Sequence, residues 1–399
     1  MRFRTNSKLV MLLCLLMVFS LFSGCAKKDG GEAQKDSAKQ ADTIKLGFLG
    51  ATTGDVACYG IPGQKGMKMA IDEVNAQGGI LGKQVVGIYE DNKGDSAEIA
   101  NIATKYITRD KVVAMVGDPC TGLTKVAAKI AQTNKVVLLS AGATSTGVVE
   151  IGDYIFRNTL LDKYASPAVV EWMVKQKGWK NIAIITSLNN SYSTGLTPLF
   201  KEAINNSGGK IVLDETINDG ETDFSAQVTK MKKVKPDVLV FTGYYKEGAL
   251  IMNEAQKQGL DIKMVGGDGL YGEDLMKLGG KAVEEKVIYY AGFTPEEKTP
   301  QTTEFIKAYK AKYNGEEPDM FAAQYYDAVM ILKKVMEDSK SSDPKVFKNE
   351  LAKLKDYPGV SGNTTIGPDR EPIKSPVCLL TVKDGSFRAL LEKIPVKAQ

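Results

Sequence analysis

Small polar residues gather in turns that follow short apolar runs, and three of these turns could hold charged groups. The turn "GDPCTG" places Thr121 and Gly122 at the expected start of a helix, where free backbone N–H groups and the helix dipole favour an anion. The turn "SAGATS" contains Gly142 and Thr144, so a ligand could approach the backbone and meet a hydroxyl. In "GGDG", Asp268 lies between glycines and could face an ammonium group.

Each of these turns also has a purely structural interpretation. Thr121 could cap its own helix, the Gly142 turn could simply join a strand to a helix, and Asp268 could be a solvated turn residue. Aromatic residues near such turns could line a cleft or belong to the core or surface. These aromatic residues are Tyr59, Tyr192, Tyr244 and Phe321.

The chain has no histidine, and this absence excludes several kinds of catalysis. Serine hydrolases of the Ser-His-Asp type, Cys-His proteases and histidine-based metal sites all need an imidazole. A dinucleotide-dependent oxidoreductase is an alternative based on "GFLGATTG", but Gly47, Gly50 and Gly54 do not match G-x-G-x-x-G. We therefore expect no enzyme, no metal and no cofactor.

Apolar runs alternate with helical patterns along the first half of the chain. Helices are expected at 60–79, after an opening loop, and at 96–110 and 123–134. The expected strands are 44–50, 83–91, 112–117 and 136–140. This alternation predicts a doubly wound parallel sheet of the α/β class.

A second, similar array begins near Lys163. Its expected strands are 181–187, 210–217, 237–243 and 263–269, and its expected helices are 166–178, 195–209, 224–234 and 247–259. Two later helices are expected, one over "TTEFIKAYKAKYNG" and one at 319–338. The segment "SPVCLLTVKDG" then predicts a strand that enters a hairpin. Ligands of open α/β sheets bind beyond the carboxyl ends of the strands, so two facing lobes would form a cleft there.

An ordered set of motifs resembles one known family. The motifs are "TGDVACYG", "AIDEVNAQGGILGKQV", "GDPCTGLT", "LLSAGATS", "FRNT", "NSYSTG", "GYYKEGALIMNEAQKQG" and "GGDG". In this order they resemble the binding proteins of branched-chain amino acid ABC transporters, of the leucine/isoleucine/valine-binding type. The resemblance runs from about residue 44 to the C-terminus.

The resemblance implies two doubly wound lobes joined by a three-stranded hinge, the periplasmic binding protein type I fold. Thr121, Gly142 and Thr144 would then bind the ligand carboxylate and part of its ammonium group. Tyr244 and Asp268 would complete the ammonium site. The side-chain pocket would be lined by Tyr59, Tyr192 and Phe321. The first lobe would comprise 44–161 and 291–375, and the second lobe would comprise 162–290 and 376–399.

Two positions depart from the family pattern. The family often has Glu where this chain has Asp268, and the shorter side chain leaves the identity of the ligand open. Some members join a loop cysteine to the position of Cys120, but this loop carries Lys93 instead. Since Cys58 and Cys120 each adjoin an expected ligand contact, a disulfide between them is the alternative to two free thiols.

The N-terminus has the pattern of a secretory signal peptide. A basic head precedes the apolar run 9–22, which is too short to span a bilayer comfortably. "SGC" then resembles a bacterial lipobox, with Phe22 where Leu is usual, which predicts cleavage after residue 24 and lipidation of Cys25. The polar segment 25–43 would be the tether. An ordinary signal peptide with a chance cysteine is the alternative.

The charge balance excludes a general nucleic-acid-binding surface. Residues 1–24 contain three basic residues and no acidic residue, so the remainder carries 49 basic and 48 acidic side chains.

From the resemblance and the N-terminal pattern together, we expect a monomeric amino acid receptor that works with an ABC transporter permease. It would be anchored to the cell membrane by lipid and face the outside of that membrane. A sensor of the same fold for amides or small organic acids is the second possibility.

Overall fold

Two sheets with the same parallel strand order form the framework of the protein. The computed structural model describes residues 43–374 and 377–394. The first sheet has the order β2-β1-β3-β4-β5, and all its neighbours are parallel. Its strands are β1 (Ile44–Phe48), β2 (Val85–Tyr89), β3 (Ala114–Val116), β4 (Val137–Ser140) and β5 (Ile155–Arg157). Strands β3 and β4 are buried along their whole length, as expected for a parallel sheet covered on both faces.

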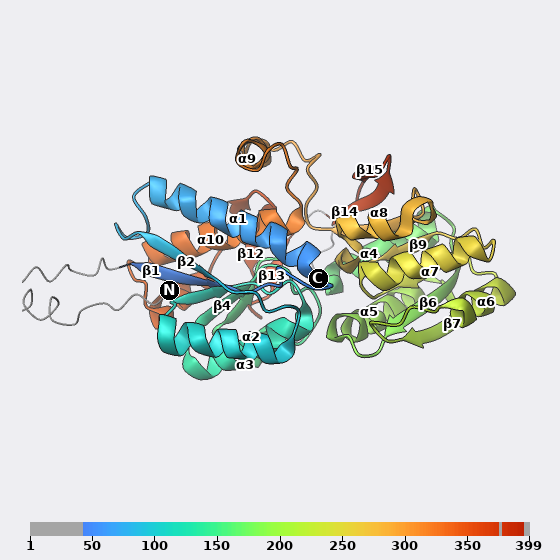
Figure 1. Ribbon diagram of the computed structural model, residues 1–399, viewed down its shortest axis with the longest axis horizontal. Helices are drawn as coiled ribbons and strands as arrows, with labels where there is room; N and C mark the ends of the chain where they lie inside the picture. The colour runs from blue at the N-terminus through green and yellow to red at the C-terminus, as the bar shows by residue number, and fades with distance from the viewer. Residues whose placement is uncertain (1–42, 375–376, 395–399) are drawn as a thin grey trace, which may run out of the picture. The chain divides into compact units, whose positions relative to one another are not determined.

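Helices cover both faces of this sheet. Helices α2 (Ser96–Lys105) and α3 (Thr121–Asn134) pack together on one face, and α1 (Ala57–Ala76) packs with α10 (Met320–Asp338) on the other (Figure 1). Helix α11 (Pro344–Leu351) packs on α10, and α9 (Pro300–Lys312) contacts a small antiparallel sheet. That small sheet consists of β11 (Tyr357–Gly359), β12 (Gly362–Ile366) and β13 (Pro372–Ile373).

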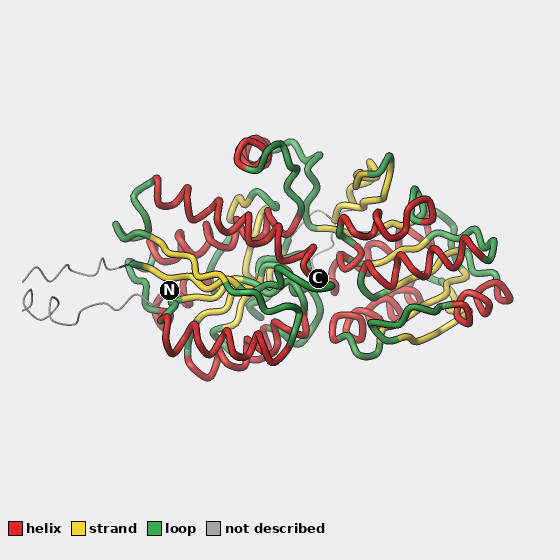
Figure 2. The backbone as a smooth tube through the Cα atoms, viewed as in Figure 1, coloured by secondary structure: helices red, strands yellow, loops and turns green. Residues whose placement is uncertain are grey.

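The second sheet repeats the order of the first and adds an antiparallel edge. Strands β7, β6, β8, β9 and β10 follow one another in parallel, and β14 and β15 then pair antiparallel beside β10. Its strands are β6 (Asn181–Ser187), β7 (Lys210–Ile217), β8 (Val238–Phe241), β9 (Met264–Gly266), β10 (Val287–Ala291), β14 (Val377–Lys383) and β15 (Ser386–Ile394). Figure 2 shows the parallel strands of this sheet between helices. The helices are α4 (Asp162–Glu171), α5 (Ser191–Ser207), α6 (Ser225–Val234), α7 (Tyr245–Lys257) and α8 (Glu273–Gly279).

Each sheet with its helices forms a lobe, so the predicted fold of two doubly wound α/β lobes is confirmed. The chain passes between the lobes after β5, after β10 and between β13 and β14. The hairpin predicted near the C-terminus is the β14–β15 pair. Strands β5 and β10, helices α8 and α11 and the small third sheet were not predicted, and all of these elements are short.

The start of α1 corrects one prediction. A loop was expected from residue 60, but the helix already begins at Ala57 and includes Gly60, Gly63 and Pro62. The glycines serve helix packing, since a Cβ at Gly66 would lie 2.0 Å from the Ala322 carbonyl oxygen of α10. Glycines that favour close packing can therefore imitate a loop in the sequence.

The N-terminal predictions fall on residues that the structure does not describe. The signal peptide, Cys25 and nearly all of the tether 25–43 lie outside the described residues. Within the described ranges, no helix combines the length and apolar character that crossing a membrane requires.

Candidate ligand-binding site

The structure brings all eight predicted ligand contacts into one region at the carboxyl ends of the parallel strands. From the first lobe, Thr121 begins α3 after β3, and Gly142 and Thr144 follow β4. From the second lobe, Tyr244 follows β8 and Asp268 follows β9. The helices supply the others, which are Tyr59 of α1, Tyr192 of α5 and Phe321 of α10. Seven of the eight are buried, and Tyr244 is partly exposed.

Helix caps fix the two aromatic residues that lie near helix starts. The Asn190 side chain caps α5 by accepting a hydrogen bond from the Tyr192 N–H at 2.9 Å. In the same way Asp319 caps α10 by accepting from the Ala322 N–H at 2.8 Å, directly beside Phe321. The caps therefore set where Tyr192 and Phe321 enter the site.

Thr121 does not cap its own helix. Its hydroxyl accepts a hydrogen bond from the Ser145 N–H at 3.4 Å, and α3 has no side-chain cap. Gly142 permits a close approach, since a Cβ there would lie 2.7 Å from the Pro119 Cα and 3.5 Å from the Phe321 ring. The start of α3 and the segment Gly142–Ser145, the ligand loop below, thus adjoin each other and offer donors to an anion.

Two buried carboxylates flank Thr144. Its hydroxyl lies 3.1 Å from an oxygen of Asp162 and 3.5 Å from an oxygen of Asp268, and the Tyr290 hydroxyl donates to Asp162 at 2.6 Å. Among the described residues, neither carboxylate takes part in an ion pair with a lysine or arginine. The pair therefore places two acidic groups side by side inside the protein, where a bound cation could pair with them.

Burial raises the pKa of both carboxyl groups. The pKa of Asp268 lies well above its ordinary value, first because burial removes water and second because the Asp162 charge is close. Burial likewise raises the pKa of Asp162, while hydrogen bonds from Tyr290 and Thr144 oppose the rise. A cation placed between these groups would stabilise their ionised forms.

The sequence interpretation missed Asp162. It begins α4, where the chain passes from the first lobe to the second, and no glycine turn marks it. The helix expected from the sequence began at Ser166, so Asp162 fell in the segment before it. Its role becomes visible only when both lobes are placed around Thr144.

The glycines around Asp268 allow two tyrosines to reach it. A Cβ at Gly267 would lie 2.2 Å from the Tyr192 hydroxyl and 2.8 Å from that of Tyr290. The Gly269 N–H donates to the Tyr192 hydroxyl at 3.2 Å. The sequence "GGDG" is therefore built around these tyrosines rather than being an ordinary solvated turn.

Aromatic rings enclose the site from both lobes. Tyr59 lies 5.1 Å from Phe321 and 5.6 Å from Tyr244, between ring centroids, and Tyr244 stacks on Tyr192 at 5.5 Å. Tyr271, which was not predicted, stacks on Phe321 at 6.3 Å. The rings form an apolar enclosure beside the charged groups, which suits a ligand with an apolar side chain.

Several bonds join the lobes directly. The Tyr59 hydroxyl donates to the Gly269 carbonyl at 2.6 Å, and the Tyr245 hydroxyl donates to the Asp55 carbonyl at 2.6 Å. Lys246 forms an ion pair with Asp55 at 2.6 Å. These contacts hold the two walls of the site together.

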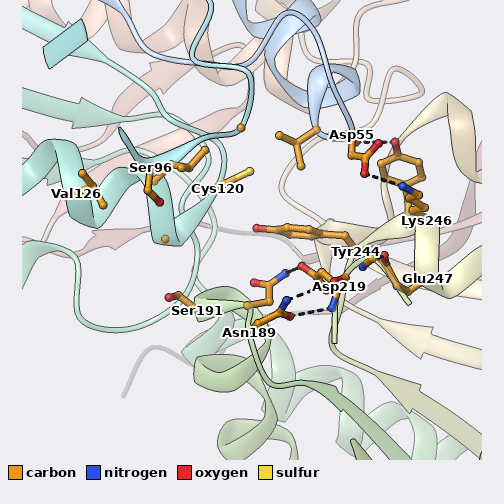
Figure 3. A pocket seen from close by; sticks show the side chains of 17 residues that line it. Asp55, Ser96, Cys120, Val126, Asn189, Ser191, Asp219, Tyr244, Lys246 and Glu247 are labelled. Carbon is orange, nitrogen blue, oxygen red and sulfur yellow. Dashed lines mark hydrogen bonds and ion pairs between the residues drawn. The ribbon is translucent and has the colours of Figure 1, made fainter. Parts of the chain in front are cut away.

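A pocket of about 400 Å³ adjoins the site between the same two walls. The first lobe contributes Asp55, Ser96 and Cys120, and the second contributes Asn189 and Tyr244 (Figure 3). In Figure 3 the Tyr244 hydroxyl points towards the side on which Cys120 lies. Of the eight predicted ligand contacts, only Tyr244 lines this pocket, and Cys120 and Gly122 line it on either side of Thr121 in sequence.

Of the two alternatives for Cys58 and Cys120, the structure shows two free thiols and no disulfide. Cys378 is not in a disulfide either. Each of the first two sulfurs has a different neighbour from the other lobe, since Tyr245 lies beside Cys58 and Tyr244 lies beside Cys120. The thiols therefore pack as small groups in the walls of the site.

The glycines of "GFLGATTG" have structural roles. A Cβ at Gly47 would lie 2.5 Å from the Tyr106 ring, and one at Gly50 would lie 2.5 Å from the Phe48 ring. Lys93, in the loop where a partner cysteine was considered, forms an ion pair with Glu98 at 3.4 Å.

Comparison with known proteins places this architecture in a family. The sequence profile of the periplasmic binding protein family matches residues 43–386. A leucine-, isoleucine-, valine-, threonine- and alanine-binding protein of Pseudomonas aeruginosa is 30% identical over 305 residues, which cover 76% of this chain and 80% of that protein.

Solved structures agree with this result. The branched-chain amino acid transporter substrate-binding protein LivJ of Streptococcus pneumoniae, in complex with isoleucine, has a TM-score of 0.81 and 36% identity over 88% of this chain and 99% of its own. A leucine-binding protein of Thermotoga maritima has a TM-score of 0.83 and 28% identity, again over 88% and 99%. The chain belongs to the periplasmic binding protein family.

Proposed function

We propose that this protein captures an amino acid between its lobes and delivers it to the permease of an ABC transporter. A branched-chain amino acid suits the site best, because apolar rings surround the place where its side chain would lie. The proposal includes no catalytic step. The relatives named above bind leucine, isoleucine or valine, and this supports the choice.

The paired carboxylates of Asp162 and Asp268 are the observation that carries the proposal. Their charges converge on Thr144, while the start of α3 and the ligand loop present donors nearby. An α-amino acid carries an ammonium group and a carboxylate a few ångströms apart, so it complements both sets of groups. A small organic acid without an ammonium group would leave the two carboxylates unmatched, which disfavours the alternative sensor for such acids.

Mass spectrometry of the ligand released from natively purified protein tests this function. We expect a zwitterionic amino acid, and calorimetry with all twenty amino acids should then rank the branched-chain ones first. Release of a nucleotide, or of an acid without an amino group, would overturn the proposal.

We further propose that the mature protein is a monomer that faces the outside of the cell membrane and is anchored to this membrane by lipid on Cys25. The apolar run 9–22 and the "SGC" motif support this location, as does membership of the family. Replacing Cys25 with Ser should release the protein from the membrane fraction or leave an uncleaved precursor. Unchanged incorporation of labelled lipid into the variant would contradict the anchor.

A further inference from the structure

The "FRNT" motif contains a buried arginine that contacts the ligand loop from behind. Arg157 ends β5 and is only 1% exposed. Its Nη1 donates to the Ala143 carbonyl at 2.9 Å and to the Ser145 carbonyl at 2.5 Å. These two carbonyls lie on either side of Thr144, so one side chain constrains the backbone both before and after the residue that faces Asp162 and Asp268.

This contact determines how the loop presents its backbone. The peptide unit is planar and trans, so a carbonyl and the N–H of the next residue point in opposite directions. Because the Ala143 carbonyl points at Arg157, the Thr144 N–H points away from it. The Thr144 carbonyl accepts from the Asp162 N–H at 3.3 Å, which fixes the next peptide unit.

A buried glutamate holds the arginine in place. Nε of Arg157 donates to Glu371 at 2.7 Å, and Nη2 donates to the other carboxylate oxygen. Glu371 is 4% exposed and lies just before β13, the strand after which the chain makes its third passage between the lobes. Only a guanidinium can form this paired contact and bind two carbonyls with its remaining N–H groups, because an ammonium has three donors from a single point.

A second buried pair lies in the same region and leaves the ligand loop untouched. Lys374 donates to the Asn158 carbonyl at 2.9 Å and to the Ser361 hydroxyl at 2.7 Å. It also interacts with the buried carboxylate of Asp327. Since both pairs connect passages between the lobes, the second provides a matched control for the first.

We propose that Arg157, oriented by Glu371, is a positioning residue that holds the ligand loop in its binding conformation and couples it to the passages between the lobes. This inference rests on the proposed amino acid binding. Loss of either member should leave the lobes folded but let the loop lose the arrangement of Thr144 between the two carboxylates.

The test compares Arg157→Lys and Glu371→Gln with Lys374→Met in the full chain. Hydrogen exchange of residues 142–146 is measured without ligand, and the dissociation constant for L-isoleucine is measured by calorimetry. Both ligand-loop variants should exchange faster in this segment and bind roughly ten- to a hundred-fold more weakly. Lys374→Met should lower the melting temperature. It should leave the hydrogen exchange of residues 142–146 and the dissociation constant for L-isoleucine at the wild-type level.

The outcomes separate this inference from the proposed function. If wild-type protein does not bind isoleucine, binding of that ligand fails, while the exchange data still test the positioning role. If the two variants keep wild-type exchange and affinity, or if Lys374→Met changes both equally, the inference is overturned. Should Arg157→Lys fail to fold, Glu371→Gln retains the size of the side chain and still decides the question.

Discussion

The two lobes have the same parallel strand order but contribute opposite chemistry to the site. In the first lobe, β3 and β4 lead into Thr121, Gly142 and Thr144, which offer hydroxyl and backbone donors. In the second lobe, β9 leads into Asp268, and α4 begins with Asp162, so carboxylates predominate. A repeated architecture has thus acquired a donor-rich wall and an acidic wall.

This difference explains why binding would favour closure. Neither wall alone matches both charges of an amino acid. The donors of the first lobe and the carboxylates of the second lie together only when the lobes meet. A ligand that contacts both walls stabilises the closed arrangement by its differential affinity for that arrangement. The bonds from Tyr59 to Gly269 and from Tyr245 to Asp55 show how closely the walls approach.

The largest effect should come from breaking the acidic wall. Asp268→Asn keeps the shape of the side chain and removes its charge, so calorimetry should show binding of L-isoleucine weakened by roughly a hundred-fold. Asp261→Asn is the control, since this exposed residue of the same lobe pairs with Lys286 at the surface. An unchanged dissociation constant for Asp268→Asn would remove this carboxylate from the site.

Preventing the walls from meeting should have the next largest effect. Gly195 of α5 faces the ligand loop, and a Cβ there would lie 2.0 Å from the Ser145 hydroxyl oxygen. Gly195→Val should weaken isoleucine binding by roughly ten-fold or more. The larger side chain would push α5 away from the ligand loop, so that several hydrogen bonds between the two walls are lost at once.

The control for this variant is Asn206→Val, which places the same side chain on the exposed part of α5. Small-angle scattering with saturating isoleucine should show the Gly195→Val protein more extended than the control. Equal compaction of both proteins would contradict closure through this contact.

A smaller loss is expected from the donor-rich wall. Thr121→Val keeps the size of the side chain and removes a hydroxyl that accepts from the Ser145 N–H. One neutral hydrogen bond contributes about 0.5–1.5 kcal/mol, so the dissociation constant for isoleucine should rise about two- to ten-fold. A loss as large as that of Asp268→Asn would refute the unequal division between the walls.

Affinity should also fall at low pH because of the acidic wall. Burial and the neighbouring Asp162 raise the pKa of Asp268, and a bound ammonium favours its ionised form. Binding therefore releases protons, and the affinity should fall by at most about ten-fold per pH unit for each proton released. Calorimetry from pH 8 to pH 5 should show this trend in wild-type protein and a weaker one in Asp268→Asn.

Stability without ligand should change in the opposite direction. Burial also raises the pKa of Asp118 to about 6 and that of Asp319 to about 7. The folded state then binds more protons than the unfolded state between about pH 4 and pH 7, so the free energy of unfolding should fall as the pH rises through this range. Chemical denaturation of the ligand-free protein would show the slope, and a rise with pH would contradict it.

The convergence of several site residues was predictable because these residues follow strands in sequence, whereas their contact with ligand was implied by the resemblance and stays a prediction. Thr121, Thr144, Tyr244 and Asp268 lie in the turns that follow β3, β4, β8 and β9, and parallel strands bring such turns to one edge. Asp162 and Arg157 were not predictable in their roles, because these depend on contacts between segments far apart in the chain. Arg157, for example, meets Glu371 more than two hundred residues away.

The choice between a disulfide and two free thiols could not be made from the sequence. Cys58 and Cys120 both adjoin the site, so their proximity was a fair inference, but neighbouring residues decide whether two thiols pair. Here Tyr245 and Tyr244 from the other lobe approach the two sulfurs. Sequence position could not reveal these tyrosine contacts.

Calorimetry with two ligands that differ only in the amino group tests the division between the walls most directly. L-leucine carries both charges, whereas 4-methylpentanoate has the same side chain and carboxylate without the ammonium group. We predict saturable binding of L-leucine and binding of 4-methylpentanoate at least roughly a hundred-fold weaker, because Asp162 and Asp268 would stay unmatched. Equal affinity for the two compounds would contradict the account.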